Sequence, residues 1–163
     1  MEITKRDQKY QLIKEPLAVG QLAAPFHLKD LHEQMYRLGD FIGKPTLISV
    51  VPDINTSVCS LQTRVFNQKL SQNEQIHFIT ISNNTLKQQE HWCQAEDLDL
   101  LMLHDPENTF GQAYGVYIPE LQVYARAIFV LDKDGVIRYE EIVSEMTHEP
   151  NYEQALAALT SLI

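Results

Sequence analysis

The sequence predicts an α/β protein with one mixed sheet and helices on both of its faces. Residues 45–70, PTLISVVPDINTSVCSLQTRVFNQKL, have the pattern of a buried strand, a short polar loop and an amphipathic helix. A second apolar segment of strand length follows at Ile76–Ile81. Late in the chain, Asp134-Gly135 separates two apolar runs, which is the pattern of an antiparallel hairpin. Strand–helix units followed by such a hairpin imply a mixed sheet covered by helices.

The residues that precede the first strand–helix unit predict several short elements. Residues 3–19, ITKRDQKYQLIKEPLAV, are expected to form a hairpin with the polar tip KRDQ. Short strands are expected at Phe26–Leu28 and Met35–Arg37, on either side of the polar connection KDLHEQ. One helical turn is expected at Leu38–Ile42.

The central unit is the best defined part of the pattern. Thr46–Val51 is an apolar, β-branched run that suits a buried strand, and Pro52 ends it because proline cannot donate to a sheet. Residues 53–57 are mostly turn and helix-capping types. The apolar side chains that follow recur at helical spacing and predict the inward face: Val58, Leu61, Val65, Phe66 and Leu70.

The second half of the chain continues the alternation. A helix is expected over Thr85–Cys93, with Leu86 and Cys93 on its inward face. A short strand is expected at Leu100–Leu103, and a helical turn at Phe110–Tyr114 that Gly115 ends. The strands of the late hairpin are Ala127–Leu131 and Val136–Val143, and an amphipathic helix begins near Tyr152. This order fits a thioredoxin-like fold.

Length and charge limit the class of protein. The 163 residues suit one domain, 1–163, in which 1–19 is a hairpin extension. The net charge of −9 argues against a nucleic-acid partner or an anionic membrane surface. No apolar run approaches the ~20 residues of a membrane span, and the start has no apolar signal segment. We therefore expect a cytoplasmic protein.

Both cysteines of the chain, Cys59 and Cys93, are candidates for chemistry. A permanent disulfide is not expected in a reducing cytosol, and the spacing excludes a CxxC motif or a four-cysteine zinc site. Cys59 falls in the first turn of a helix that follows a core strand. Free backbone N–H groups and the helix dipole favour a thiolate at that position. A buried cysteine that only packs is the competing interpretation.

Four other residues have both a structural and a functional interpretation. Thr56 caps the helix, donates its hydroxyl to the thiolate or a substrate oxygen, or does both. Pro52 ends the strand or walls off the sulfur from solvent. Cys93 packs in the core or acts as a second thiol, and Arg126 is a solvated strand end or an inward-facing cation beside a thiolate. The histidines have no metal-ligand spacing and no glycine-rich phosphate loop is present, so we expect no cofactor and no metal.

The stretch from Pro52 to Cys59, PDINTSVC, resembles the PxxxTxxC motif of the peroxiredoxins. The likeness is to their thiol peroxidase subfamily and extends over nearly the whole chain. Further matching segments are LISVVPDINTSVC, TRVFNQ, ITISNN, WCQAE, QAYGV, ARAIFVLD and EPNYE. Ser57 and Trp92 depart from the glycine and phenylalanine that are frequent in the subfamily.

This resemblance implies a thioredoxin-dependent peroxidase that serves antioxidant defence. Cys59 would be the peroxidatic cysteine and Cys93 the resolving cysteine of an atypical 2-Cys enzyme, with both cysteines in one subunit. Thr56, Pro52 and Arg126 would complete the active site. The enzyme would reduce hydrogen peroxide and alkyl hydroperoxides through a Cys59 sulfenic acid and a Cys59–Cys93 disulfide. Thioredoxin would be the reducing partner, and a homodimer the usual assembly.

Other functions remain open at this point. The main alternative is a peroxide-sensing switch that uses the same cysteine pair to control a protein partner. A general disulfide reductase and a thiol-ligated metal carrier are further alternatives. The side chains that would form an apolar rim around the site are guesses from the sequence: Ile54, Val58, Tyr114 and Tyr117.

Overall fold

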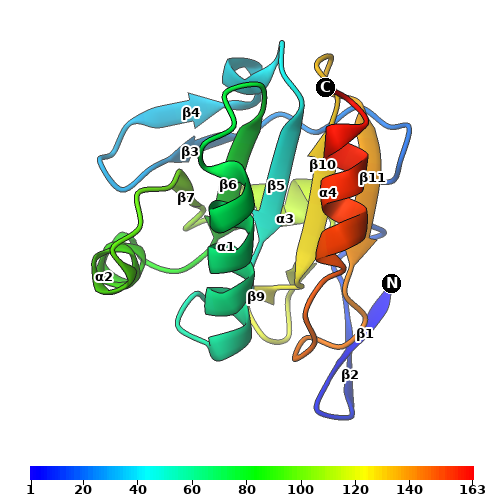
Figure 1. Ribbon diagram of the computed structural model, residues 1–163. Helices are drawn as coiled ribbons and strands as arrows, with labels where there is room; N and C mark the ends of the chain where they lie inside the picture. The colour runs from blue at the N-terminus through cyan, green and yellow to red at the C-terminus, as the bar shows by residue number, and fades with distance from the viewer.

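The computed structural model describes all residues from Met1 to Ile163. Its centre is a seven-stranded sheet in the order β11-β10-β5-β6-β7-β3-β4 (Figure 1). The strands are β3 His27–Lys29, β4 Met35–Arg37, β5 Thr46–Val50, β6 His77–Ser82, β7 Met102–His104, β10 Ala127–Leu131 and β11 Ile137–Ile142. The β5–β6 and β6–β7 pairs are parallel, and the other pairs are antiparallel. The predicted mixed sheet is therefore confirmed.

The helices lie on both faces of this sheet. α1, Ser57–Leu70, and α4, Tyr152–Thr160, run side by side across one face, and α3, Thr109–Tyr114, lies behind the sheet (Figure 1). α2, Leu86–Glu96, lies beyond α1 at the side of the molecule (Figure 1). The 3₁₀ turn η1 covers Leu38–Phe41. Two short strands that the sequence did not predict, β8 Tyr117–Ile118 and β9 Val123–Tyr124, pair with each other.

Both faces of β5 and β10 are buried, and their side chains are apolar except for Thr46 and Ser49 of β5. Leu47, Ile128 and Val130 pack with α1 and α4 in one cluster. Ile48 and Phe129 point to the opposite face and join the larger cluster beneath α3. These strands sit at the middle of the sheet, so whatever follows their ends is held by a rigid support.

The inward face of α1 differs from the prediction. Phe66 and Leu70 are buried as expected, but Leu61 is exposed and Val58 and Val65 are only half-buried. The buried face also contains the polar side chains of Gln62, Thr63 and Asn67. Apolar periodicity therefore located the helix correctly but predicted the wrong inward face. Polar residues occupy part of the true inward face, because Gln62 and Thr63 form buried hydrogen bonds near Cys59.

The N-terminal hairpin is present but shorter than predicted. β1, Glu2–Lys5, pairs with β2, Gln8–Gln11, and residues 12–19 contain no strand. Arg6 and Asp7 form the turn with positive φ angles, as in a tight two-residue hairpin turn. The strand ends differ from the prediction by one or two residues, such as β7, which begins at Met102 rather than Leu100. α2 runs to Glu96 rather than Cys93, and Leu86, expected on its inward face with Cys93, is only half-buried. No helix combines the length and apolar character that crossing a membrane requires.

Candidate active site around Cys59

Strand pairing explains how Cys59 and Arg126 meet. β5 ends at Val50, and α1 begins at Ser57 after a short loop. β10 runs antiparallel to β5 with Ala127 opposite Val50. Arg126, which directly precedes β10, therefore lies at the same edge of the sheet as Pro52 and the first turn of α1. Residues separated by 67 positions along the chain are brought together in this way.

The Cys59 sulfur is fully buried and contacts two donors. The Nη1 of Arg126 donates to Cys59 Sγ at 3.3 Å, and the backbone N–H of Asp53 donates to it at 3.4 Å. The predicted inward orientation of Arg126 is found, and its side chain is only 2% exposed. Both donors favour a negative charge on the sulfur over a neutral thiol.

Arg126 is fixed by two further acceptors. Its Nη2 and Nε donate to the Met146 carbonyl at 2.7 and 3.2 Å, and Nη1 also donates to Gln62 Oε1 at 3.0 Å. Gln62 in turn donates from Nε2 to Ser49 Oγ at 2.8 Å. The guanidinium therefore has an orientation that the surrounding groups fix before any ligand arrives.

The loop before α1 is held by a side chain from the neighbouring strand. Asn84, two residues beyond the end of β6, accepts from the Ile54 N–H at 2.9 Å and donates to the Asp53 carboxylate at 2.9 Å. Since β5 and β6 are parallel, their following loops meet at one edge of the sheet. Asn84 therefore sets the position of the Asp53 N–H that contacts Cys59.

Thr56 does not donate to the sulfur as predicted. It precedes α1 as N-cap, but its side chain caps no helix N–H. Its hydroxyl instead donates to the Asp53 carbonyl at 2.8 Å. The Thr56 hydroxyl proton is therefore already used in this hydrogen bond, and the lone pairs of Thr56 Oγ1 are free to accept another one.

A pocket of about 360 Å³ opens beside this centre. Pro52, Thr56 and Arg126 all line it, so three of the predicted site residues share one cavity. Pro52 is buried, and its role as a wall that limits solvent access to the sulfur stays a prediction. The remaining lining residues are Lys5, Arg6, Asp53, Ser57, Val58, Val123, Met146 and Thr147.

The guesses about an apolar rim were mostly wrong. Val58 lines the pocket, whereas Ile54 and Tyr114 are fully buried in the core. Tyr117 is half-buried beside the core cluster and lines no part of the pocket. Val123 and Met146 supply the remaining apolar surface. Sequence periodicity cannot tell a core tyrosine from a rim tyrosine, because both interrupt an apolar pattern in the same way.

Cys93 lies near the end of α2, and both cysteines are free thiols. Cys59 and Cys93 belong to one small buried cluster with Val51, Ile54, Trp92 and Met102. Burial raises the pKa of Cys93 to about 11, and the nearby Asp99 carboxylate adds to the effect. The thiol at Cys93 is thus kept protonated while α2 is in place.

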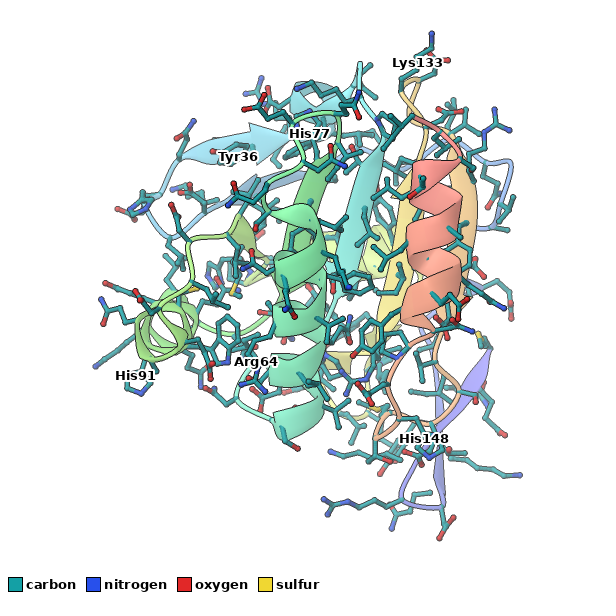
Figure 2. The ribbon with its side chains drawn as sticks, in the orientation of Figure 1. Tyr36, Arg64, His77, His91, Lys133 and His148 are labelled. Atoms are coloured by element: carbon teal, nitrogen blue, oxygen red, sulfur yellow. The ribbon has the colours of Figure 1, made fainter.

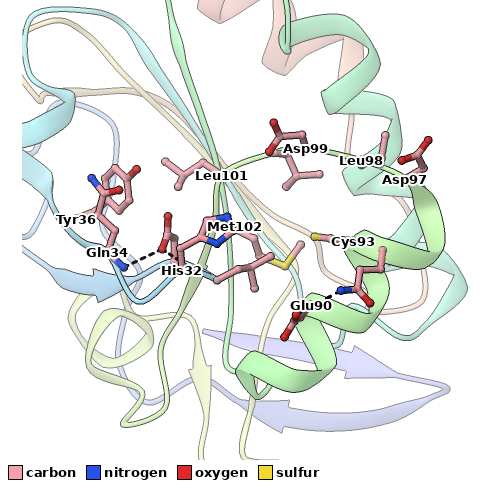
Figure 3. A pocket seen from close by; sticks show the side chains of 14 residues that line it. His32, Gln34, Tyr36, Glu90, Cys93, Asp97, Leu98, Asp99, Leu101 and Met102 are labelled. Carbon is pink, nitrogen blue, oxygen red and sulfur yellow. Dashed lines mark hydrogen bonds between the residues drawn. The ribbon is translucent and has the colours of Figure 1, made fainter.

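A second cavity, of about 680 Å³, lies on the other side of Cys93. α2, the segment after it and the β3–β4 connection form its walls. Figure 3 shows the Cys93 side chain directed into this space toward Met102. One side of α2 is therefore left unpacked at the turn that carries Cys93.

Three residues of this centre were not predicted from the sequence: Gln62, Asn84 and Met146. Gln62 had a detectable signal, because it follows Cys59 by three residues and so shares its helix face. Asn84 follows a predicted strand, and its role depends on which strand neighbours β5. Met146 acts through its backbone carbonyl, which carries no signal in the side-chain pattern.

The chain is similar to known proteins over nearly its whole length. Residues 19–140 match the AhpC/TSA family. The chain is 39% identical to a thiol peroxidase of Bacillus subtilis over 99% of this chain and 98% of the relative. It is 41% identical to a thiol peroxidase of Staphylococcus aureus over 99% of each.

Solved structures show the same fold. A peroxiredoxin-like protein from Aquifex aeolicus superposes with a TM-score of 0.93 at 26% identity, covering 99% of this chain and 97% of that one. A thiol peroxidase from Chromobacterium violaceum gives a TM-score of 0.88 at 18% identity, covering 99% and 96%. The chain therefore belongs to the AhpC/TSA family and, within it, to the thiol peroxidase branch of the peroxiredoxins.

Proposed function

We propose that the protein is a thiol peroxidase that reduces hydrogen peroxide and organic hydroperoxides with Cys59 as the reacting nucleophile. The observation that carries this proposal is the environment of Arg126. The guanidinium is buried, and none of the ion pairs in the structure includes it. A buried charge is costly unless an opposite charge accompanies it. Among the groups that Arg126 contacts, only Cys59 can supply that charge.

The first chemical step oxidises Cys59. The Cys59 thiolate attacks the terminal oxygen of a hydroperoxide that enters through the Pro52–Thr56–Arg126 pocket, whose lining does not include the buried Cys59 itself. The O–O bond breaks, Cys59 becomes a sulfenic acid, and the other oxygen leaves as alcohol or water after gaining a proton. Thr56 Oγ1 accepts a hydrogen bond from the peroxide O–H, and Arg126 donates to the oxygens as charge moves between them.

The second step forms a disulfide. α2 unwinds locally, Cys93 attacks the sulfenic sulfur, water leaves, and a Cys59–Cys93 disulfide results. Solvent exposure during unwinding lowers the pKa of Cys93 from its raised value, so the resolving thiol becomes reactive only after it leaves its buried position. An external dithiol then reduces the disulfide and returns both thiols.

Two variants test the assignment of the cysteines. Cys59→Ser should lose all peroxide consumption, because no sulfenic acid can form. Cys93→Ser should keep the first oxidation and lose multiple turnover with thioredoxin, thioredoxin reductase and NADPH. Continued turnover by Cys59→Ser would contradict the nucleophile, and undiminished turnover by Cys93→Ser would contradict the resolving role. Multiple turnover by the unmodified protein also separates an enzyme from a switch that is oxidised once.

We further propose thioredoxin as the reductant, a homodimer as the assembly and the cytoplasm as the compartment. The resemblance to thiol peroxidases supports the first two, and two free thiols suit a reducing compartment. Glutathione with its reductase in place of the thioredoxin system should give little turnover. Sedimentation should give twice the 18.8 kDa chain mass. Cell fractionation should recover the protein with cytoplasmic enzymes.

A further inference from the structure

The tip of the N-terminal hairpin reaches the active-site pocket. Lys5, the last residue of β1, and Arg6, in the turn, line the same cavity as Pro52, Thr56 and Arg126. The hairpin lies at the end of the sheet where α1 begins (Figure 1). None of the family-matching segments quoted above includes these two cations. Their position beside the reacting centre raises the question of what they bind.

The hairpin is fixed at this place by the segment that also holds Arg126. The Thr4 N–H donates to the Ser144 carbonyl, and the Met146 N–H donates to the Thr4 carbonyl, each at 2.8 Å. The Glu145 carboxylate accepts from the Arg6 N–H at 2.8 Å and from Thr4 Oγ1 at 3.1 Å. Met146 then supplies the carbonyl that accepts from Arg126. Lys5 and Arg6 are therefore held in a defined position relative to the site.

The pocket is positive although the protein is strongly negative. Lys5, Arg6 and Arg126 are its cationic side chains, and Asp53 is its only carboxylate. Neither Lys5 nor Arg6 takes part in any ion pair of the structure. Asp53 is already engaged by Asn84 and by the Asn55 N–H. In a chain of net charge −9, the lining of this pocket therefore carries more cationic than anionic side chains, with the Glu145 carboxylate held nearby at the Arg6 N–H.

Part of the wall of the same pocket is apolar. Val58, Val123 and Met146 supply that surface. We propose that the pocket selects organic hydroperoxides that carry a carboxylate, with the carboxylate bound by Lys5 and Arg6 and the hydrocarbon part on the apolar wall. This proposal rests on the proposed peroxidase function and specifies its substrate class.

The expected size of the effect is moderate. Solvent-exposed ion pairs change affinity by about two- to fivefold each. Removing both cations should therefore lower kcat/KM for an anionic substrate by roughly fivefold or more, with no matching loss for a neutral one. The preference should also weaken with added salt, because both cations are exposed.

The test compares three peroxides in three proteins. The peroxides are an aliphatic hydroperoxide with a terminal carboxylate, its methyl ester, and hydrogen peroxide. The proteins are the unmodified chain, Lys5→Gln/Arg6→Asn and the control Lys9→Gln. Asparagine tolerates the positive φ of position 6. Lys9 lies in β2 of the same hairpin, is exposed, pairs with Glu2, and does not line the pocket.

We expect the unmodified protein and Lys9→Gln to favour the carboxylate over the ester, and the double variant to lose that preference. Hydrogen peroxide should react equally with all three, which also checks folding. An equal rate for acid and ester in the unmodified protein, or a preference that survives in the double variant, would overturn the proposal.

A binding measurement tests the site without turnover. The saturated acid that lacks the peroxide should protect Cys59 from a neutral alkylating reagent, and its methyl ester should protect less. That difference should disappear in the double variant, and its persistence there would contradict the proposal. Failure of the unmodified protein to reduce any of the three peroxides would instead contradict the proposed function, while the protection experiment would still report on the carboxylate site.

Discussion

At the scale of single residues, we propose that the reactivity of Cys59 depends on the hydrogen bonds around Arg126. The guanidinium contacts Cys59 Sγ with the same Nη1 that donates to Gln62 Oε1. Gln62 presents its oxygen, not its NH₂ group, because that NH₂ group donates to Ser49 Oγ. The hydroxyl of a core strand therefore sets the amide orientation that aligns the arginine with the sulfur.

Gln62→Met should slow the oxidation of Cys59 by about tenfold, because a misaligned donor stabilises the transition state less. The substitution keeps the volume but leaves a buried N–H without its acceptor, which costs about 1–3 kcal/mol of stability. Gln62→Glu should not recover the rate, because its carboxylate would give Arg126 a second negative partner that competes with Cys59. The measurement is the second-order rate constant with one hydroperoxide in a Cys93→Ser background. Equal rates for the Met variant and its parent would refute the alignment role.

The reactivity of Cys93 should depend on pH, and this dependence should show whether α2 is folded. Burial raises the pKa of Cys93 to about 11 in the folded protein, against ~8.5 for a free cysteine. Because the pKa of Cys93 is raised when α2 is folded, the folded helix is fully favoured over the unwound one below the pKa of free cysteine. This preference is lost as the pH rises toward 11.

In a Cys59→Ser variant, alkylation of Cys93 should therefore be slow near neutral pH and rise steeply at alkaline pH. Asp99→Asn should shift the rise to lower pH, because it removes the carboxylate that adds to the raised pKa. Alkylation of Cys93 at the rate of a free cysteine at neutral pH would show that the helix does not protect it.

At the scale of elements, α2 is attached to α1 by few contacts. Trp92 Nε1 donates to Ser60 Oγ at 3.0 Å, and Arg64 pairs with Glu96 at 3.2 Å. Arg64 extends from α1 on the side that faces α2 (Figure 2). The cavity beside Cys93 removes packing from the other side. These features suit a helix that must unwind while the sheet stays intact.

Ser60→Ala should make α2 open more easily, because it deletes the partner of the Trp92 N–H. The loss of about 1 kcal/mol corresponds to roughly a fivefold shift of the opening equilibrium. The disulfide should then form faster after one equivalent of peroxide. Trp92 is the only tryptophan, so its fluorescence reports the change directly. Arg64→Gln is the matched control and should have little effect, because its exposed ion pair contributes less. An unchanged rate in Ser60→Ala would rule out the hydrogen bond as a restraint on opening.

The elements themselves were largely predictable, and their neighbours in space were not. Periodicity and turn residues placed β5, α1, β10 and α4 because each depends on contiguous residues. The same patterns say nothing about which strands pair, so the alignment of Ala127 with Val50 could not be derived from composition or spacing. Arg126 was identified at the site by resemblance, whereas Gln62, Asn84 and the Met146 carbonyl emerge only from the fold.

For the molecule as a whole, we propose that the hairpin and the sheet form a single unit. Ile3 and Leu12 are buried members of the large core cluster, and Thr4 bridges to Glu145. The hairpin thus shares both apolar and backbone contacts with the rest of the chain. A single cooperative transition is the expected behaviour of such a domain.

Ile3→Ala should lower the one thermal transition of the protein by roughly 5–10 °C, because it removes a buried side chain at a cost of about 2–4 kcal/mol. Lys9→Gln in the same hairpin should leave the transition unchanged, since Lys9 is exposed. Calorimetry checks both. A separate small transition for the hairpin, with the main one unmoved, would mean that it is an independent unit.

We propose above all that the contacts of Arg126 and the Asp53 N–H make Cys59 a fast nucleophile toward hydroperoxides. The most direct measurement is the second-order rate constant for oxidation of Cys59 by hydrogen peroxide in Cys93→Ser at neutral pH. We predict a constant at least about a hundredfold above that of free cysteine at the same pH, as preorganised donors typically provide. A rate equal to that of free cysteine would contradict the claim.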